Sequence, residues 1–324
     1  MIIKSPSDLI FDDVFMELPG IVAQTSVFVK LEGLSASGSI KIKTALRMIE
    51  RLELERQLGP GRSLIESSSG NLGLALSLIC AIKGYPFICV SDPNISPYTA
   101  KLIKAYGARL IIVKERDKNG GFLSSRIDLI NSMLAADSNL VWSNQYSNIN
   151  NVEAHYLKTG PAILREFPDP SYVFVGVGTT GTLGGISRYL RQYAPDTKII
   201  AVDTIGSVTF GQPSGARHIP GLGTSQPPEI RQHSSFDDLM MVKEEDALSM
   251  CYQLAQRGIL LGGSSGTVLC GVRQYAGHIA PSDCVVAISP DLGDRYIDTV
   301  YNPDWVKLHY PYFNSINETV TIPI

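Results

Sequence analysis

Three glycine-rich segments carry hydroxyl side chains at spacings suited to binding anions. They are Glu66-Ser-Ser-Ser-Gly-Asn-Leu-Gly73, Gly176-Val-Gly-Thr-Thr-Gly-Thr182 and Leu260-Leu-Gly-Gly-Ser-Ser-Gly266. Each enters a segment with helical character, and the N–H groups at a helix N-terminus attract anions. The first segment has more hydroxyls than an ordinary N-cap needs, which favours a ligand carboxylate. The third can be read equally well as a plain helix start.

The second segment supports two different interpretations. Glycines at positions 176, 178 and 181 form G-x-G-x-x-G, and Asp203 ends the next predicted strand, as in the dinucleotide-binding fingerprint of NAD-dependent dehydrogenases. Thr179, Thr180 and Thr182 add hydroxyls that suit a phosphate monoester better than a pyrophosphate. Spacing alone leaves both interpretations open.

Lys41 is the candidate nucleophile. It follows a Gly-Ser pair at the start of an apolar helix predicted over 44–54. The positive end of a helix dipole disfavours a second positive charge, so it lowers the pKa of a nearby lysine and frees its amine. Lys43 competes by position but lies further into the helix.

Two series of strand and helix segments position these residues. The first series predicts strands at 63–66, 86–91, 109–113 and 139–142, separated by helix-length segments. The second predicts strands at 172–175, 198–203 and 284–289 and helices at 183–192, 244–257 and 265–278. This alternation is typical of parallel sheets, and ligands bind where the carboxyl ends of such strands meet. Residues 206–226 are predicted to form an ordered loop over the site.

The composition excludes several classes of protein. The 324 residues are 44% hydrophobic and carry a net charge of −3, which argues against nucleic-acid and anionic-membrane partners. Residues 1–9 contain no apolar signal core, so we expect a cytoplasmic protein. The five cysteines show no C-x-x-C spacing and are predicted to be buried free thiols. The five histidines lack metal-ligand spacing, so we expect no metal.

Taken together, the lysine and the three loops resemble the fold-type II pyridoxal 5'-phosphate (PLP) enzymes, the cysteine synthase and cystathionine β-synthase family. The order matches from the Gly-Ser-x-Lys segment to the G-x-S-S-G loop. The resemblance implies an α/β fold of two parallel-sheet domains with a cofactor cleft between them. It implies a smaller mobile domain over 36–145, a larger domain over 1–35 and 146–324, and a homodimer.

The resemblance also implies roles for individual residues. Lys41 would be the catalytic Schiff-base lysine, and Ser264 would face the pyridine nitrogen of PLP. Asn71 would bind both the ring hydroxyl and the substrate. The phosphate would be held by Gly178, Thr179, Thr180, Gly181 and Thr182. The α-carboxylate of the substrate would be bound by Ser68, Ser69, Asn71 and Gln145. Phosphoserine and glutamate bring further anionic groups, for which Arg126 and Tyr146 are candidate donors. Arg126 can be read equally well as a charge on a helix surface.

Within the family, the sequence is similar to the branch that makes N-(2-amino-2-carboxyethyl)-L-glutamate. The shared stretches are Glu66–Gly73, Asp92–Pro97, Gly120–Arg126, Asn144–Tyr146, Ala201–Val208, Pro220–Gly223 and Pro290–Tyr296. This resemblance implies β-replacement of O-phospho-L-serine by L-glutamate through an aminoacrylate, for 2,3-diaminopropionate and siderophore biosynthesis. A cysteine synthase with another nucleophile is the alternative, and a dehydrogenase is the more remote one. Ile42 and Lys43 stand where the family usually has aspartate and arginine.

Overall fold

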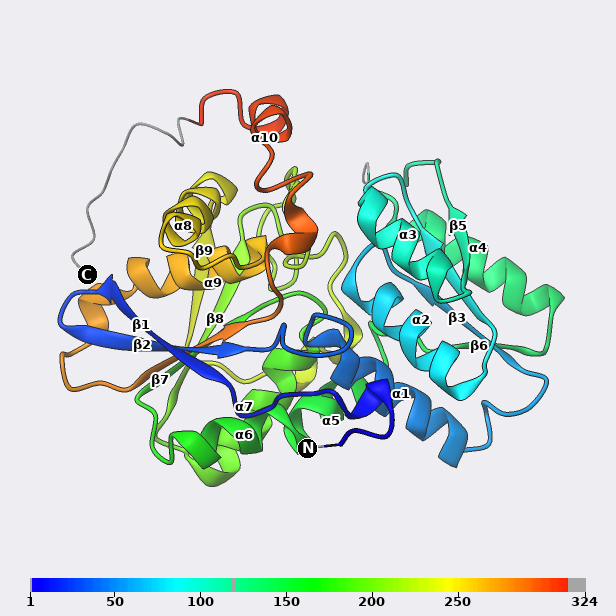
Figure 1. Cartoon of the computed structure of the whole chain (residues 1–324), viewed down its shortest axis with the longest axis horizontal. Helices are drawn as coiled ribbons and strands as arrows, with labels where there is room; N and C mark the ends of the chain where they lie inside the picture. The colour runs from blue at the N-terminus through cyan, green and yellow to red at the C-terminus, as the bar shows by residue number, and fades with distance from the viewer. Residues whose placement is uncertain (1, 118–120, 314–324) are drawn as a thin grey trace.

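Two separate β-sheets organise the chain, as the computed structural model in Figure 1 shows. The structure describes residues 2–117 and 121–313. The six-stranded sheet has the order β1-β2-β10-β7-β8-β9, and the four-stranded sheet has the order β5-β4-β3-β6. The strands of the larger sheet are β1 (Phe15–Val22), β2 (Thr25–Leu31), β7 (Tyr172–Gly176), β8 (Lys198–Thr204), β9 (Asp238–Val242) and β10 (Val285–Ser289). Those of the smaller are β3 (Ser63–Ser67), β4 (Phe87–Ser91), β5 (Arg109–Ile112) and β6 (Leu140–Trp142).

Helices cover the faces of both sheets. We call the four-stranded sheet with α1 (Lys41–Leu54), α2 (Asn71–Lys83), α3 (Pro97–Ala105) and α4 (Leu123–Ala136) the smaller lobe. The larger lobe is the six-stranded sheet with α5 (Asn150–Leu157), α6 (Thr159–Glu166), α7 (Gly181–Tyr193), α8 (Glu244–Gln256), α9 (Gly263–Gln274) and α10 (Pro303–His309). In Figure 1, α8 and α9 lie on one side of the larger sheet and α5, α6 and α7 on the other. Short 3-10 helices occupy 6–8, 229–233, 276–278 and 294–296.

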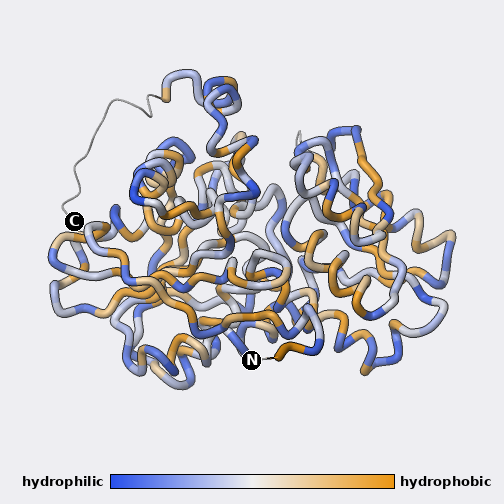
Figure 2. The backbone as a smooth tube through the Cα atoms, viewed as in Figure 1, coloured by the Kyte–Doolittle hydropathy of each residue, from blue (hydrophilic) through white to orange (hydrophobic). Residues whose placement is uncertain are grey.

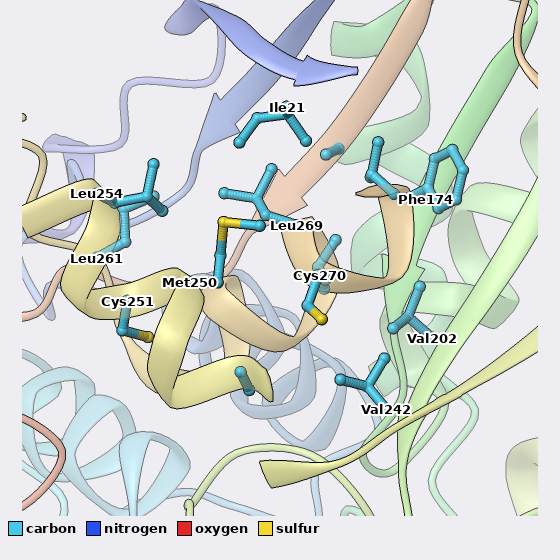
Figure 3. Close-up of a cluster of buried hydrophobic side chains, with 14 of the residues drawn as sticks. Ile21, Phe174, Val202, Val242, Met250, Cys251, Leu254, Leu261, Leu269 and Cys270 are labelled. Carbon is cyan, nitrogen blue, oxygen red and sulfur yellow. The ribbon is translucent and has the colours of Figure 1, made fainter. Parts of the chain in front are cut away.

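The central strands are apolar on both faces because helices bury both. Phe174 of β7 packs into a cluster with α8 and α9, whereas its neighbours Val173 and Val175 pack against α7. This alternation follows from the two-residue period of a strand. Figure 3 shows part of the first cluster, which includes Met250, Cys251, Leu254, Leu269 and Cys270. Figure 2 shows hydrophobic residues along the strands of both lobes, and the smaller lobe has core clusters of its own.

The predicted α/β class with parallel sheets is confirmed, and so are the seven predicted strands. The hairpin of β1 and β2 was not predicted. Pro19 and Gly20 interrupt β1, and proline removes a hydrogen-bond donor that an interior strand needs. β1 is an edge strand whose register shifts between Leu18 and Val22, so the sheet tolerates both residues. The short edge strand β9 was also missed.

Some of the remaining predictions from the sequence can be compared with the structure, and others cannot. All five cysteines are free thiols, four of them buried and Cys284 half-buried. Within the described ranges, no helix is long and apolar enough to span a membrane. The predicted boundaries of the two domains stay a prediction, and their residues 1, 118–120 and 314–324 lie outside the described ones. Gly120 of the stretch 120–126 lies there too.

Candidate active site

Lys41 is the first residue of α1, two positions before Lys43, the next lysine of this helix. Its side chain is half-buried, and its amine makes no hydrogen bond or ion pair with any residue that the structure describes. Burial lowers the pKa of Lys41 to about 8, because a charged ammonium loses hydration without gaining a carboxylate. A far larger share of Lys41 than of an ordinary lysine is therefore a free amine near neutral pH.

Lys43 is in a different environment, which removes it as the competing nucleophile. Its Nζ lies 2.8 Å from Glu32 Oε1 and forms a second ion pair with Asp12. Burial would lower the pKa of Lys43, but the carboxylates of Glu32 and Asp12 raise it above its ordinary value. Lys30 joins the same cluster, with its Nζ 3.0 Å from Glu32. Lys43 is thus a charged structural residue.

The loop before α7 is closely packed. Thr180 has a φ of +69°, and its buried hydroxyl has no partner among the described residues. A side chain at Gly178 would place its Cβ 2.9 Å from the carbonyl oxygen of Gly221, and one at Gly181 would collide with the Asn151 amide. Loop 206–226 therefore lies against this loop, as predicted. Free N–H groups, an unpaired buried hydroxyl and the helix N-terminus suit a phosphate.

Two side chains from α5 support the phosphate loop, and sequence reasoning missed both. Asn151 Nδ2 donates to Thr179 Oγ1 and to the carbonyl oxygen of Gln145, each at 2.9 Å. His155 Nε2 lies 3.2 Å from Thr182 Oγ1, and burial holds the pKa of His155 well below its ordinary value. His155 is therefore neutral. Neither residue stands in a glycine loop, so the sequence contained no local signal for it.

A buried carboxyl group, that of Glu66, fixes the start of the loop before α2 through hydrogen bonds. Glu66 accepts hydrogen bonds from Ser67 N at 2.7 Å, Ser143 Oγ at 2.7 Å, Trp142 Nε1 at 3.2 Å and Gln145 N at 3.2 Å. Burial raises the pKa of Glu66. Glu66 thus joins the ends of β3 and β6, so the loops that carry Ser68 and Gln145 lie together.

The residues predicted to bind the substrate carboxylate differ in how many hydrogen bonds they already make within the protein. Ser68 Oγ accepts from Gly73 N at 2.9 Å, so it caps α2 while its own proton stays free. The half-buried Ser69 hydroxyl has no partner among the described residues. Gln145 Nε2 donates to the carbonyl oxygen of Ser67 at 2.9 Å, which leaves one amide proton for a ligand. Free donors remain at all three positions.

Arg126 is buried, with 7% of its surface exposed, and is not the surface charge that its place on a helix also allowed. It forms an ion pair of 3.3 Å with Asp92, and its Nε has no partner among the described residues. A hydrogen bond joins it to Tyr146, whose pKa burial raises. A buried guanidinium with a free N–H is suited to a substrate anion.

Ser264 is buried at the start of α9 and meets two other predicted site residues through Asp291. Ser264 Oγ donates to Asp291 Oδ1 at 3.4 Å, and Asn71 Nδ2 donates to Asp291 Oδ2 at 2.6 Å. The backbone of Asp291 pairs with Ser39, two residues before Lys41. The structure thereby brings the lysine, the first loop and the third loop to one place. Asp291 was not predicted as a site residue.

The acid of the dinucleotide fingerprint is not free to bind a ribose. Asp203 is 1% exposed, and its Oδ1 accepts a hydrogen bond from the backbone N–H of Thr204 at 2.8 Å. Burial raises the pKa of Asp203. The described ranges also contain no group of three His, Cys, Asp or Glu side chains that could hold a metal ion. The geometry fits a phosphate, a ring and a carboxylate around Lys41.

Comparisons with known proteins agree with this geometry. Residues 10–291 match the family model described as pyridoxal-phosphate dependent enzyme. An N-(2-amino-2-carboxyethyl)-L-glutamate synthase of Ralstonia nicotianae is 41% identical over 310 residues, which are 94% of this chain and 92% of the relative. The synthase of the same name from Cupriavidus metallidurans is 41% identical over 88% of this chain and 85% of its own. The crystal structure of O-acetylserine dependent cystathionine beta-synthase from Helicobacter pylori matches with a TM-score of 0.86 and 26% identity, covering 92% of this chain and 98% of the other.

Proposed function

The chain belongs to the pyridoxal-phosphate dependent enzyme family, and we propose that it joins the amine of L-glutamate to the β-carbon of O-phospho-L-serine. The product would be N-(2-amino-2-carboxyethyl)-L-glutamate, with phosphate released. The observation that carries this proposal is the 41% identity to two synthases of that product over most of the chain. The cofactor is PLP, as the family requires.

The residues around Lys41 suit this cofactor. Thr179, Thr180 and Thr182, with the N–H groups at the start of α7, would hold its phosphate. Asn71 would bind the ring hydroxyl, and Ser264 would face the pyridine nitrogen. When bound, PLP supplies an electron sink that stabilises negative charge at Cα of an amino acid. A neutral serine at the pyridine nitrogen keeps that sink moderate, which suits elimination at Cβ.

Lys41 would act as the base and the acid of the reaction. Its amine takes the proton from Cα, and its pKa of about 8 lets it both accept and return a proton near neutral pH. Loss of that proton lets the bond from Cβ to the phosphate oxygen break, and phosphate leaves with the electron pair. The glutamate nitrogen then forms a bond to Cβ and gives up a proton, while Lys41 returns one to Cα.

The smaller lobe would recognise the anionic groups of the substrates. Ser68, Ser69 and Gln145 have free donors for the α-carboxylate of the serine-derived substrate. Arg126 and Tyr146 lie beside that loop and would bind the phosphate or a glutamate carboxylate. Sulfide, the nucleophile of the alternative function, carries no carboxylate that such a buried guanidinium could bind.

The test is product formation by the purified enzyme. With PLP, O-phospho-L-serine and L-glutamate, mass spectrometry should find N-(2-amino-2-carboxyethyl)-L-glutamate and an equal amount of phosphate. Sulfide in place of glutamate tests the cysteine synthase alternative. Faster phosphate release with sulfide than with glutamate, together with cysteine as product, would replace the proposed function by that alternative.

The wider setting belongs to the same proposal. The product is a precursor of 2,3-diaminopropionate, so we place the enzyme in siderophore or related natural-product biosynthesis. A homodimer in the cytoplasm is the assembly and location that the family resemblance implies. Closure of the smaller lobe over the bound carboxylate would keep water from the reacting atoms.

A further inference from the structure

Asp291 and Arg295 hold the two ends of the Asn71 side-chain amide. Asn71 Nδ2 donates to Asp291 Oδ2 at 2.6 Å, while Arg295 donates to Asn71 Oδ1. Asp291 is fully buried and Arg295 is 8% exposed. A carboxylate only accepts hydrogen bonds and a guanidinium only donates them. The amide can therefore adopt one of its two orientations and not the other.

The same two side chains also contact the segment that leads into Lys41. Arg295 Nη2 donates to the carbonyl oxygen of Ser37 at 3.0 Å, and the backbone of Asp291 pairs with Ser39. Gly38 has a φ of +67°, and any side chain there would collide with the Arg295 guanidinium. The amide of Asn71 and the lysine segment are thus fixed by common partners.

We propose that Asp291 and Arg295 are positioning residues for the cofactor ring, which they serve by orienting the Asn71 amide. In the observed orientation Nδ2 gives one proton to Asp291. Its other proton has only a 3.4 Å contact with the Tyr296 hydroxyl oxygen, whose own proton goes to Asp291. That second proton has no short acceptor in this structure and is available to the ring hydroxyl oxygen. The reversed amide would direct the lone pairs of Oδ1 at that oxygen and repel it.

The inference rests on the proposed contact of Asn71 with the ring and is independent of the nucleophile. The same hydrogen bonds could instead serve only to stabilise the contact between the lobes. This structural role and the positioning role can be told apart by one property. A positioning role acts through Asn71 and disappears when Asn71 is removed, whereas a structural role persists.

A double-mutant cycle on the PLP-loaded enzyme tests this difference. Asp291→Asn keeps the size of the side chain but can turn to either end of Asn71, and Arg295→Met removes the donor to Oδ1. Each is made alone and together with Asn71→Ala. The readouts are the dissociation constant of PLP and the pH midpoint of the visible absorption band, which depends on the hydrogen bond to the ring oxygen. Arg273→Met is the control, because its half-buried guanidinium bonds to Gln253 at 3.0 Å and not to the site.

We expect Asp291→Asn and Arg295→Met each to weaken PLP binding about tenfold and to move the pH midpoint toward that of Asn71→Ala. In the Asn71→Ala background most of each effect should disappear, and only the part that acts through Ser264 or Ser37 should remain. Equal losses in both backgrounds would overturn the inference alone. An Asn71→Ala variant with unchanged band and affinity would overturn both the inference and the proposed contact of Asn71. Arg295→Lys, which keeps the charge but not the planar fork, gives the same comparison if Arg295→Met does not fold.

Discussion

The two ends of the active site are built by different physical means. The phosphate loop of the larger lobe is fixed by close packing, since any side chain at Gly178 or Gly181 would meet neighbouring atoms. The carboxylate loop of the smaller lobe is fixed by hydrogen bonds to one buried carboxyl group, that of Glu66. A side chain at Gly70 of that loop would meet nothing within 4 Å.

This difference indicates what each end does. A packed loop accepts one ligand in one position, which suits a resident cofactor. A loop held by hydrogen bonds and open on one side can adjust when a substrate enters and leaves. We therefore expect changes at the phosphate loop to abolish cofactor binding and changes at the carboxylate loop to alter the KM of the substrate.

Lys41→Met should have the largest effect. Removing the amine removes the base at Cα, so phosphate release should fall more than about a thousandfold. Lys43→Met is the contrasting variant, because Lys43 lies in an ion cluster and not at the reacting atoms. It should lower the thermal stability without a comparable loss of kcat in the enzyme that remains folded. A Lys41→Met enzyme with nearly normal turnover would refute the assignment.

Gly181→Ala should nearly abolish cofactor binding. The added methyl group would collide with Asn151, which also holds Thr179 and Gln145, so the loop must move. We expect the dissociation constant of PLP, measured by visible absorption, to rise about a hundredfold. Gly277→Ala, in open space outside the site, is the control and should bind PLP normally. Normal PLP binding by Gly181→Ala would show that close packing does not fix the conformation of the phosphate loop.

The rate of PLP uptake by the apoenzyme should depend on pH through Lys41. Only the free amine reacts with the aldehyde, and burial lowers the pKa of Lys41 to about 8. Uptake should rise about tenfold from pH 7 and level off above about pH 9. Stopped-flow absorption measures the midpoint. A rate that keeps rising toward pH 10 would mean that Lys41 has the pKa of an exposed lysine.

Glu66→Gln should affect the substrate end alone. If the new amide nitrogen faces Ser67 N and Trp142 Nε1, two hydrogen bonds are lost. If it faces Ser143 Oγ and Gln145 N, the bond from Gln145 N is lost, because only the serine hydroxyl can turn to accept. We expect the KM for O-phospho-L-serine to rise about tenfold with PLP affinity unchanged. If PLP affinity fell as much as the KM rose, the two ends would not be separate.

Tyr146→Phe should have the smallest effect. It removes one hydroxyl beside Arg126 and leaves the ion pair of Arg126 with Asp92 in place. A single hydrogen bond contributes about 1 kcal/mol, so kcat/KM should fall by a few-fold. Steady-state kinetics, with each substrate varied in turn, would show whether Tyr146 contacts O-phospho-L-serine or L-glutamate. No change for either substrate would place Tyr146 outside the substrate site.

The sequence could predict the parts of the site that depend on local chemistry. Glycines and hydroxyls that follow a strand and begin a helix indicate an anion site without any tertiary information, as in the loops of Ser68 and Thr179. The parts that depend on distant partners could not be predicted. Asp291 and Asn71 are 220 residues apart. Glu66 was read as the start of a loop, because only the structure shows the donors of Ser143 and Gln145 around it.

The choice between Lys41 and Lys43 shows the same limit. Both lie near the start of one helix, and their sequence positions differ by half a turn. Their environments differ because Glu32 and Asp12, from the segment before the helix, pair with Lys43 and not with Lys41. Where the usual arginine of the family is replaced by Lys43, these carboxylates still neutralise the charge.

The central claim is that the amine of glutamate becomes bonded to the β-carbon of the serine-derived substrate. Its most direct test uses L-glutamate labelled with a heavy isotope at the amine nitrogen, together with unlabelled O-phospho-L-serine, the purified enzyme and PLP. The account predicts a product whose secondary amine carries the label, formed in equal amount to the phosphate released. Phosphate released without any labelled product, or a product joined through another atom, would contradict it.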